Sequence, residues 1–144
     1  MPGIIRIVAL TALLSGGLAG AALAESTGEG MPEGSAERGR LIFAKCRTCH
    51  YPEKEVGHNN GPSLWNLFNL RVGSQPGFEY SAALREADFV WTPELLDLWL
   101  QDPRGFLPGN EMMSAGESDA QRRADLIEYL KQVSAPSEDE GEAE

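Results

Sequence analysis

Two cysteines and a histidine form the densest group of reactive side chains in the sequence: Cys46, Cys49 and His50. Residues three and four apart lie on one face of a helical turn, so both thiols and the imidazole can reach one flat ligand. The spacing is the C-x-x-C-H pattern of covalent haem attachment. Each thiol can add to a haem vinyl group, and the histidine can offer a ring nitrogen to the iron. The sequence therefore predicts one haem c, attached through Cys46 and Cys49, with His50 as an axial ligand.

Three other interpretations of the cysteine pair are weaker. A redox disulfide with this spacing is typical of a βαβ unit, and the sequence has no convincing strand pattern. A zinc site needs four ligands, and the sequence offers no second Cys/His pair beyond this one. A structural disulfide would make the position of His50 accidental.

The opposite face of the iron needs a second ligand, and three residues are candidates. Met112 and Met113 lie in a loop rich in proline and glycine. A His/Met pair favours a high reduction potential and electron transfer, but methionine is often core filler, and the residues alone leave the choice open. His58, the only other histidine, lies in a polar loop at 51–60 and is the remaining alternative.

Helices must position these groups, and the sequence predicts an all-α domain. Ser35 is a suitable N-cap for a helix from about Ala36 into Cys46. Gly39 within it predicts a close approach by another helix, because a glycine otherwise weakens a helix. A short helical turn is expected near 64–68, followed by a short helix over 81–85.

The second half of the chain carries two stronger helix signals. Thr92-Pro93-Glu94 begins a helix that Asp102-Pro103 ends. A loop is then expected over 103–116. The last helix is predicted to begin at Ser118, where Gln121 completes a capping-box pattern. Its apolar stripe consists of Leu126, Ile127, Leu130 and Val133.

The chain has 144 residues and a net charge of −10, which suggest one domain and argue against binding to nucleic acid or to anionic membrane surfaces. Residues 1–24 are predicted to be a signal peptide, with cleavage after Ala24 and export to the periplasm. The alternative is an uncleaved membrane anchor. Residues 25–34 are predicted to be a flexible leader, 35–134 the folded domain and 135–144 a disordered acidic tail.

Further motifs follow the cysteine pair in a fixed order. They are Gly39 and Phe43 before it, and after it Gly61-Pro62-Ser63-Leu64, Pro76-Gly77-Phe78-Glu79-Tyr80, Trp91, Leu100, Asp102-Pro103, Pro108-Gly109-Asn110-Glu111-Met112 and Asp125-Leu126-Ile127-Glu128-Tyr129-Leu130. In order and spacing these resemble a class I cytochrome c of the small soluble bacterial type related to the mitochondrial carrier. The resemblance covers about Ser35 to Val133.

The resemblance implies an all-helical fold around one haem, with the first and last helices crossing. It implies that Met112, rather than its neighbour, is the sixth ligand. It also implies that the Pro62 carbonyl accepts a hydrogen bond from His50, and that Trp99 lies near the methionine sulfur. Hydrogen bonds to a haem propionate are implied for Tyr80 and Trp91.

The implied function is that of a monomeric periplasmic carrier that moves one electron at a time between redox partner proteins and is not an enzyme. Two alternatives stay open: a haem enzyme or gas or peroxide sensor with a labile sixth ligand, and a membrane-anchored electron-transfer module. Three positions depart from the family pattern. Leu70 stands where an arginine is frequent, with Arg71 displaced by one, and Glu111 and Ser114 flank the ligand methionine.

Basic residues near the haem motif could make the protein dipolar despite its acidic total, or could be scattered solubilising charges. They are Arg38, Arg40, Lys45, Arg47 and Lys54.

Overall fold

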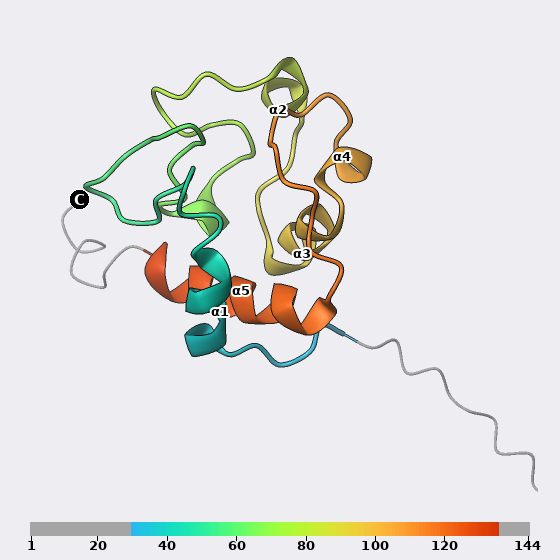
Figure 1. Cartoon of the computed structure of the whole chain (residues 1–144). Helices are drawn as coiled ribbons and strands as arrows, with labels where there is room; N and C mark the ends of the chain where they lie inside the picture. Colours follow the sequence, from blue (N-terminus) through green and yellow to red (C-terminus); the bar gives the residue numbers. More distant parts are fainter. Residues whose placement is uncertain (1–29, 136–144) are drawn as a thin grey trace, which may run out of the picture.

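A computed structural model of the protein describes residues 30–135 (Figure 1). The expected signal peptide, the first five residues of the leader and all but the first residue of the acidic tail lie outside this range. The described part contains five α-helices and one 3₁₀ turn: α1 (Ala36–Phe43), η1 (Leu67–Asn69), α2 (Ala82–Glu86), α3 (Pro93–Gln101), α4 (Pro103–Phe106) and α5 (Ala120–Val133). Within these residues the only β-type pairing is an isolated bridge between Arg71 and Val90. The all-α prediction is confirmed.

α1 begins where the sequence predicts and ends earlier. The Ser35 side chain accepts a hydrogen bond from the Arg38 backbone N–H. The helix ends at Phe43, however, and residues 44–49 follow as turns. The backbone N–H groups of Cys46 and Arg47 both donate to the Phe43 carbonyl, at 2.8 and 2.9 Å. The prediction of a continuous helix into Cys46 is therefore corrected, because these shared bonds wind the segment into tighter turns.

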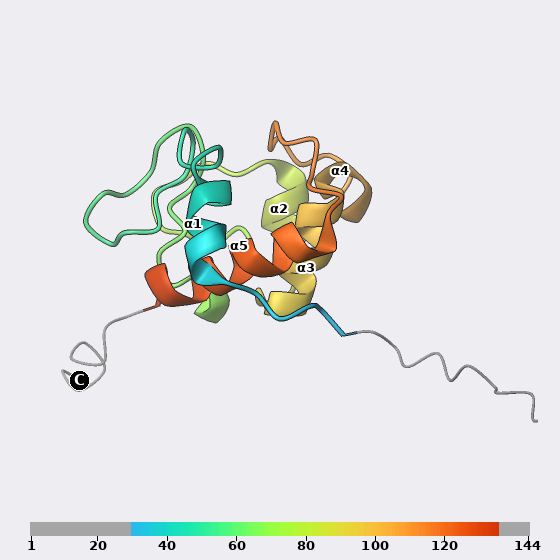
Figure 2. The same cartoon turned by 60° about the horizontal axis from the view of Figure 1, so that its bottom comes forward.

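α1 packs across the middle of α5 (Figure 2). A Cβ added at Gly39 would lie 2.0 Å from the Asp125 carbonyl oxygen, so only glycine permits this approach. Phe43 lies on the same face, is 2% exposed, and contacts the Tyr129 ring with centroids 5.3 Å apart. The predicted close approach at Gly39 is confirmed.

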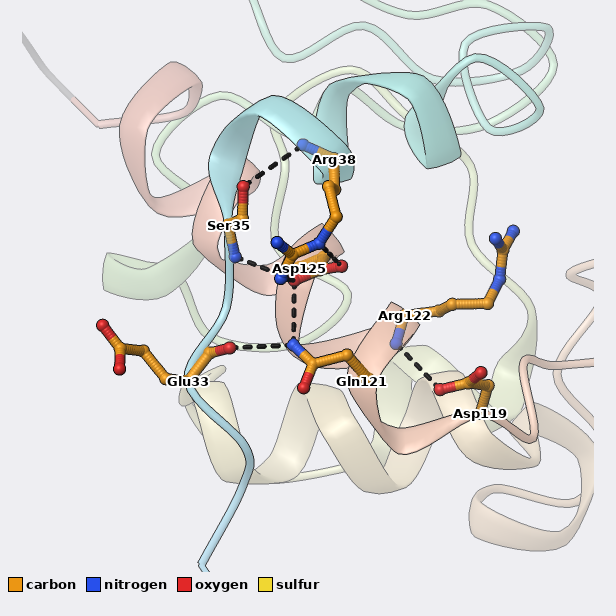
Figure 3. A network of polar contacts seen from close by, with 7 residues as sticks. All are labelled: Glu33, Ser35, Arg38, Asp119, Gln121, Arg122 and Asp125. Atoms are coloured by element: carbon orange, nitrogen blue, oxygen red, sulfur yellow. Dashed lines mark hydrogen bonds and ion pairs between the residues drawn. The ribbon is translucent and has the colours of Figure 1, made fainter.

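One buried carboxylate joins the start of α1 to α5 (Figure 3). The Asp125 side chain is 3% exposed. It accepts hydrogen bonds from the Ser35 backbone N–H at 2.8 Å, from Arg38 Nε and Nη2 at 2.7 Å each, and from Gln121 Nε2 at 3.0 Å. These bonds, that from Arg38 above all, hold the pKa of the Asp125 carboxyl well below its usual range.

The start of α5 differs from the prediction. Asp119 is the N-cap, and its side chain accepts from the Arg122 backbone N–H at 3.1 Å. Gln121 does not close a capping box with Ser118. Its amide instead donates to the Glu33 carbonyl at 2.8 Å and to Asp125. An aspartate caps a helix as well as a serine, and the position of Gln121 is set by these tertiary contacts.

The end of the expected leader is also packed. Met31 contacts the hydrophobic core, and a Cβ added at Gly34 would lie 2.2 Å from the Ala124 carbonyl oxygen. The last residues of the predicted flexible leader are therefore packed against the folded domain. The glycine lets this segment run against the α5 backbone.

α3 follows the prediction closely, and a short helix comes after it. Thr92 Oγ1 accepts from the Leu95 backbone N–H, with Pro93 in the first turn. Asp102 ends α3 and also caps α4, because its side chain accepts from the Gly105 backbone N–H at 3.0 Å. The sequence predicted a loop from Pro103. Because proline suits the first position of a helix, the residue that ends α3 can also start α4.

The core is formed where these elements converge. Its buried apolar members are Ile42, Phe43, Leu67, Val72, Trp91, Leu96, Trp99, Leu126, Ile127 and Leu130. α5 is joined to α3 by a buried ion pair in which Arg123 Nε lies 2.8 Å from Asp97. No helix among residues 30–135 has the length and apolar character needed to cross a membrane.

Candidate haem-binding site

The turns after α1 bring the reactive group together. The backbone N–H groups of Cys49 and His50 both donate to the Cys46 carbonyl, at 3.0 and 2.9 Å, so the three side chains project from one helical turn. Both cysteines are free thiols and half-buried. Burial raises the pKa of the Cys46 thiol. Free cysteines at this spacing fit thioether attachment and do not show the disulfide of the competing interpretations.

His50 is held in the tautomer that a metal ligand needs. Its Nδ1 lies 2.8 Å from the Pro62 carbonyl oxygen, as the resemblance implies. A carbonyl can only accept, so Nδ1 carries the proton and Nε2 keeps its lone pair. Burial lowers the pKa of His50 and favours the neutral ring. A Cβ added at Gly61 would lie 2.4 Å from Cε1, so glycine leaves room for the imidazole.

The two methionines differ in burial. Met112 is half-buried and packs against the hydrophobic core, whereas Met113 is 93% exposed. The backbone N–H of Met112 donates to Asn110 Oδ1 at 3.0 Å, and the Asn110 amide donates to the carbonyls of Pro103 and Leu107. The structure thus supports Met112 rather than Met113 as the inward ligand.

His58 is engaged by the protein through both ring nitrogens. The Ser63 backbone N–H donates to Nδ1 at 2.9 Å, and Nε2 lies 2.9 Å from the Pro76 carbonyl oxygen. Nε2 must therefore carry the proton, and neither nitrogen keeps a free lone pair. His58 connects two loops and is not available as an iron ligand in this structure.

The two residues implied for a propionate differ in burial: Trp91 is buried and Tyr80 is half-buried. Trp91 is 9% exposed, and its ring contacts Trp99 edge-on with centroids 5.6 Å apart. Burial raises the pKa of the half-buried Tyr80 hydroxyl, opposed by a hydrogen bond with the backbone of Gln75. Trp99, implied to lie near the methionine sulfur, is 6% exposed.

Sequence reasoning missed Ser81 as a candidate site residue. Its hydroxyl is buried and has no hydrogen-bond partner in the described part of the protein. The sequence predicted a short helix that begins at Ser81, but α2 begins at Ala82 and Ser81 makes no side-chain bond to it. A buried orphan hydroxyl beside Tyr80 fits a polar group of a bound cofactor. Its position next to Tyr80 is the only sequence signal that could have found it.

The donor set therefore fits a c-type haem: two thiols for thioether bonds, one imidazole with an available lone pair, one inward thioether and an orphan hydroxyl. A zinc site is not supported. Between residues 30 and 135, no three or more His, Cys, Asp or Glu side chains gather as metal ligands would.

The basic residues near the cysteine pair are largely balanced by carboxylates. Lys45 pairs with Glu117 at 2.9 Å and Arg47 with Glu53 at 2.6 Å, and Arg38 joins Asp125. Arg71 pairs with exposed Asp88 at 3.0 Å. Of the five basic residues near the cysteine pair, Arg38, Lys45 and Arg47 each pair with a carboxylate.

Comparison with known proteins places these features in a family. The chain is 45% identical over 105 residues to a cytochrome c from Chlamydomonas reinhardtii, covering 72% of this chain and 94% of that protein. It is 40% identical to a cytochrome c from Sesamum indicum over 72% of this chain and 95% of the relative, and 38% identical to one from Ulva intestinalis over 76% and 100%. No family model matches the chain.

Proposed function

This chain belongs to the cytochrome c family, and we propose that it is a periplasmic one-electron carrier with a single haem c and His50 and Met112 as axial ligands. It shuttles electrons between redox partner proteins and is an electron-transfer protein rather than an enzyme. The observation that carries this proposal is the pairing of a histidine whose Nδ1 is tied to Pro62 with a methionine that packs inward.

The cysteines attach the haem, and the two proposed iron ligands set its reduction potential. When bound, the haem supplies a one-electron couple between ferrous and ferric iron. Cys46 and Cys49 hold it covalently, so it stays with the protein through repeated turnover. The Pro62 carbonyl keeps His50 oriented and makes it a stronger ligand. Met112 supplies a soft thioether, which favours the ferrous state and a high potential.

The rest of the site excludes water. Trp91, Trp99 and Leu67 are buried in the core cluster against which Met112 packs. A dry, low-dielectric surrounding reduces reorganisation on electron transfer and prevents water from replacing the methionine. No side chain here needs to move a proton.

The periplasmic location and the bacterial type are supported by the sequence of residues 1–24, which has a short apolar stretch and an Ala-Leu-Ala end. The relatives compared above are eukaryotic. A monomer with two successive redox partners fits a small soluble carrier. Encounter with these partners is steered by charge, but not by a lysine ring: Glu111 stands beside Met112, and Lys45 is already paired.

The adjacent methionines provide a matched test of this function. Ferric wild-type protein should show the weak red absorption band of sulfur-to-iron charge transfer. Met112→Ala should abolish this band and lower the reduction potential by on the order of 0.2 V, because the soft thioether that favours ferrous iron is lost. Met113→Ala should leave both unchanged.

A high-spin wild-type spectrum without the band would contradict the carrier and favour an enzyme or sensor with an open sixth position. Loss of the band in Met113→Ala rather than in Met112→Ala would show that the ligand was assigned to the wrong methionine. The mass of the mature protein separates a cleaved signal peptide from a retained anchor.

A further inference from the structure

Glu117 lies where three parts of the chain meet. One oxygen of its carboxylate, Oε2, is 2.9 Å from Lys45 Nζ and 3.0 Å from Arg122 Nε. The Glu117 side chain is 15% exposed, so it is largely shielded from water. Hydrogen bonds from Lys45 and then Arg122 lower the pKa of its carboxyl to about 2. The group is therefore an anion wherever the protein is folded near neutral pH.

The backbone around Glu117 is fixed as well. Its N–H donates to the Leu100 carbonyl at 2.8 Å, and its carbonyl accepts from Arg123 Nη1 at 3.0 Å. Gly116 has φ +94°, and a Cβ there would lie 2.3 Å from the Gln101 carbonyl oxygen. These contacts place Glu117 against the end of α3 and the start of α5.

The residues between Met112 and Gly116 have a different environment. Met113 is 93% exposed, and Ser114 and Ala115 are also exposed. The peptide that carries Met112 is thus held from its N-terminal side by Asn110 and from its C-terminal side by the segment at Glu117. Failure of the second anchor would free this peptide without unfolding the helices.

Lys45, which pairs with Glu117, immediately precedes Cys46 in the sequence. Through Lys45, Glu117 connects the segment that attaches the haem to the segment that carries the opposite ligand. We propose that Glu117 is a positioning residue for Met112, an ionic clasp that keeps the methionine loop closed over the haem. This inference rests on the proposed His50 and Met112 ligation.

The chain offers a matched control for this clasp. Arg47 and Glu53 form an ion pair of 2.6 Å in the same haem-attachment segment, and the two residues are only six positions apart. Within residues 30–135, no hydrogen bond or ion pair joins either side chain to the methionine loop. Glu53→Gln therefore removes another carboxylate that pairs with a cation beside a haem cysteine, although the Glu53 side chain is 43% exposed against 15% for Glu117. Glu117→Gln keeps the shape of the side chain and removes only the charge.

The experiment compares haem-loaded wild type, Glu117→Gln, Lys45→Gln and Glu53→Gln. The first reading is the rate of carbon monoxide binding to the ferrous protein, which reports how often the methionine leaves. Glu117→Gln should raise this rate about fivefold, and Lys45→Gln should raise it in the same direction. Glu53→Gln should bind at the wild-type rate.

The second reading separates loop opening from unfolding. In guanidinium, the charge-transfer band of Glu117→Gln should disappear at a lower concentration than in wild type. Its helical circular dichroism should be lost at nearly the wild-type midpoint. A purely structural role would shift both midpoints together, and that result would overturn the proposal.

The remaining outcomes are also decisive. Equal carbon monoxide rates in Glu117→Gln and Glu53→Gln, with a normal band in wild type, would refute the clasp and leave the carrier function standing. A wild-type protein with no band would refute both, because no methionine would then be bound for the clasp to hold.

Discussion

The crossing of α1 and α5 and the loop at 107–119 hold opposite sides of the candidate haem site in different ways. At the crossing, backbone packs directly on backbone at Gly39, and the buried Asp125 carboxylate accepts from three residues. In the loop, the side chain of Asn110 holds one end, and the side chain and backbone of Glu117 hold the other. The residues between Met112 and Gly116 are exposed.

The firmness of these contacts determines which side of the site can open more easily. The segment that carries His50 follows α1 directly, so it should be released only when the helix crossing is lost. The loop that carries Met112 has fewer buried contacts, and local opening with a smaller free energy is expected there. The residue proposed to set the potential therefore lies on the less firmly held side.

The largest effect is expected when the crossing itself is broken. Gly39→Ala adds a Cβ that would lie 2.0 Å from the Asp125 carbonyl oxygen, so the helices must separate. Although alanine favours helix formation, the free energy of unfolding should fall by about 2–4 kcal/mol. The band and the circular dichroism should be lost together in a denaturant titration. Gly30→Ala is the control, because a Cβ added at Gly30 would have no atom within 4 Å. It should leave the free energy of unfolding unchanged.

A smaller global effect is expected at the buried carboxylate. Asp125→Asn should lower the free energy of unfolding by about 2 kcal/mol at neutral pH, since the charge-assisted bonds to Arg38 weaken. The folded pKa of Asp125 lies below its ordinary value of 3.8. Its stabilisation is thus complete above that value and is lost as pH falls towards the folded pKa.

Unfolding curves at several pH values check this second expectation. The gap between wild type and Asp125→Asn should be constant above about pH 5 and should narrow below about pH 4. A gap that widened in acid would mean that the carboxyl is more easily protonated in the folded protein, contrary to the contacts in Figure 3.

Much of the helix crossing could be predicted from the sequence, because local signals and tertiary packing agree there. Ser35 caps α1 as expected, and Gly39 meets α5. Outside the crossing, Thr92 caps α3 as expected. The start of α5 could not be predicted from the capping-box pattern, because the Gln121 amide donates hydrogen bonds to the Glu33 carbonyl and to Asp125. Such long-range competition leaves no local trace in the sequence.

Part of the candidate site could also be predicted from the sequence, and part could not. The C-x-x-C-H spacing identifies Cys46, Cys49 and His50, because covalent attachment dictates it. The choice of Met112 needed family resemblance, since adjacent methionines have the same chemistry and only burial separates them. Ser81 and Glu117 could be identified only from the structure. Ser81 is notable because its buried hydroxyl has no partner among the described residues, and Glu117 because its partner Lys45 is 72 positions away in the sequence.

The smallest effect is expected at Asn110, which holds the start of the methionine loop. Asn110→Ala removes one hydrogen bond to the Met112 N–H and two to the carbonyls of Pro103 and Leu107. Water can replace part of these bonds because the position is half-buried. The free energy needed to open the loop should therefore fall by only about 1 kcal/mol. The charge-transfer band should vanish at a lower denaturant concentration, while the circular dichroism midpoint stays close to wild type. Exposed Asn60→Ala is the control. If both midpoints of Asn110→Ala moved together, the loop and the crossing would form one cooperative unit, and their difference in strength would have no consequence for the site.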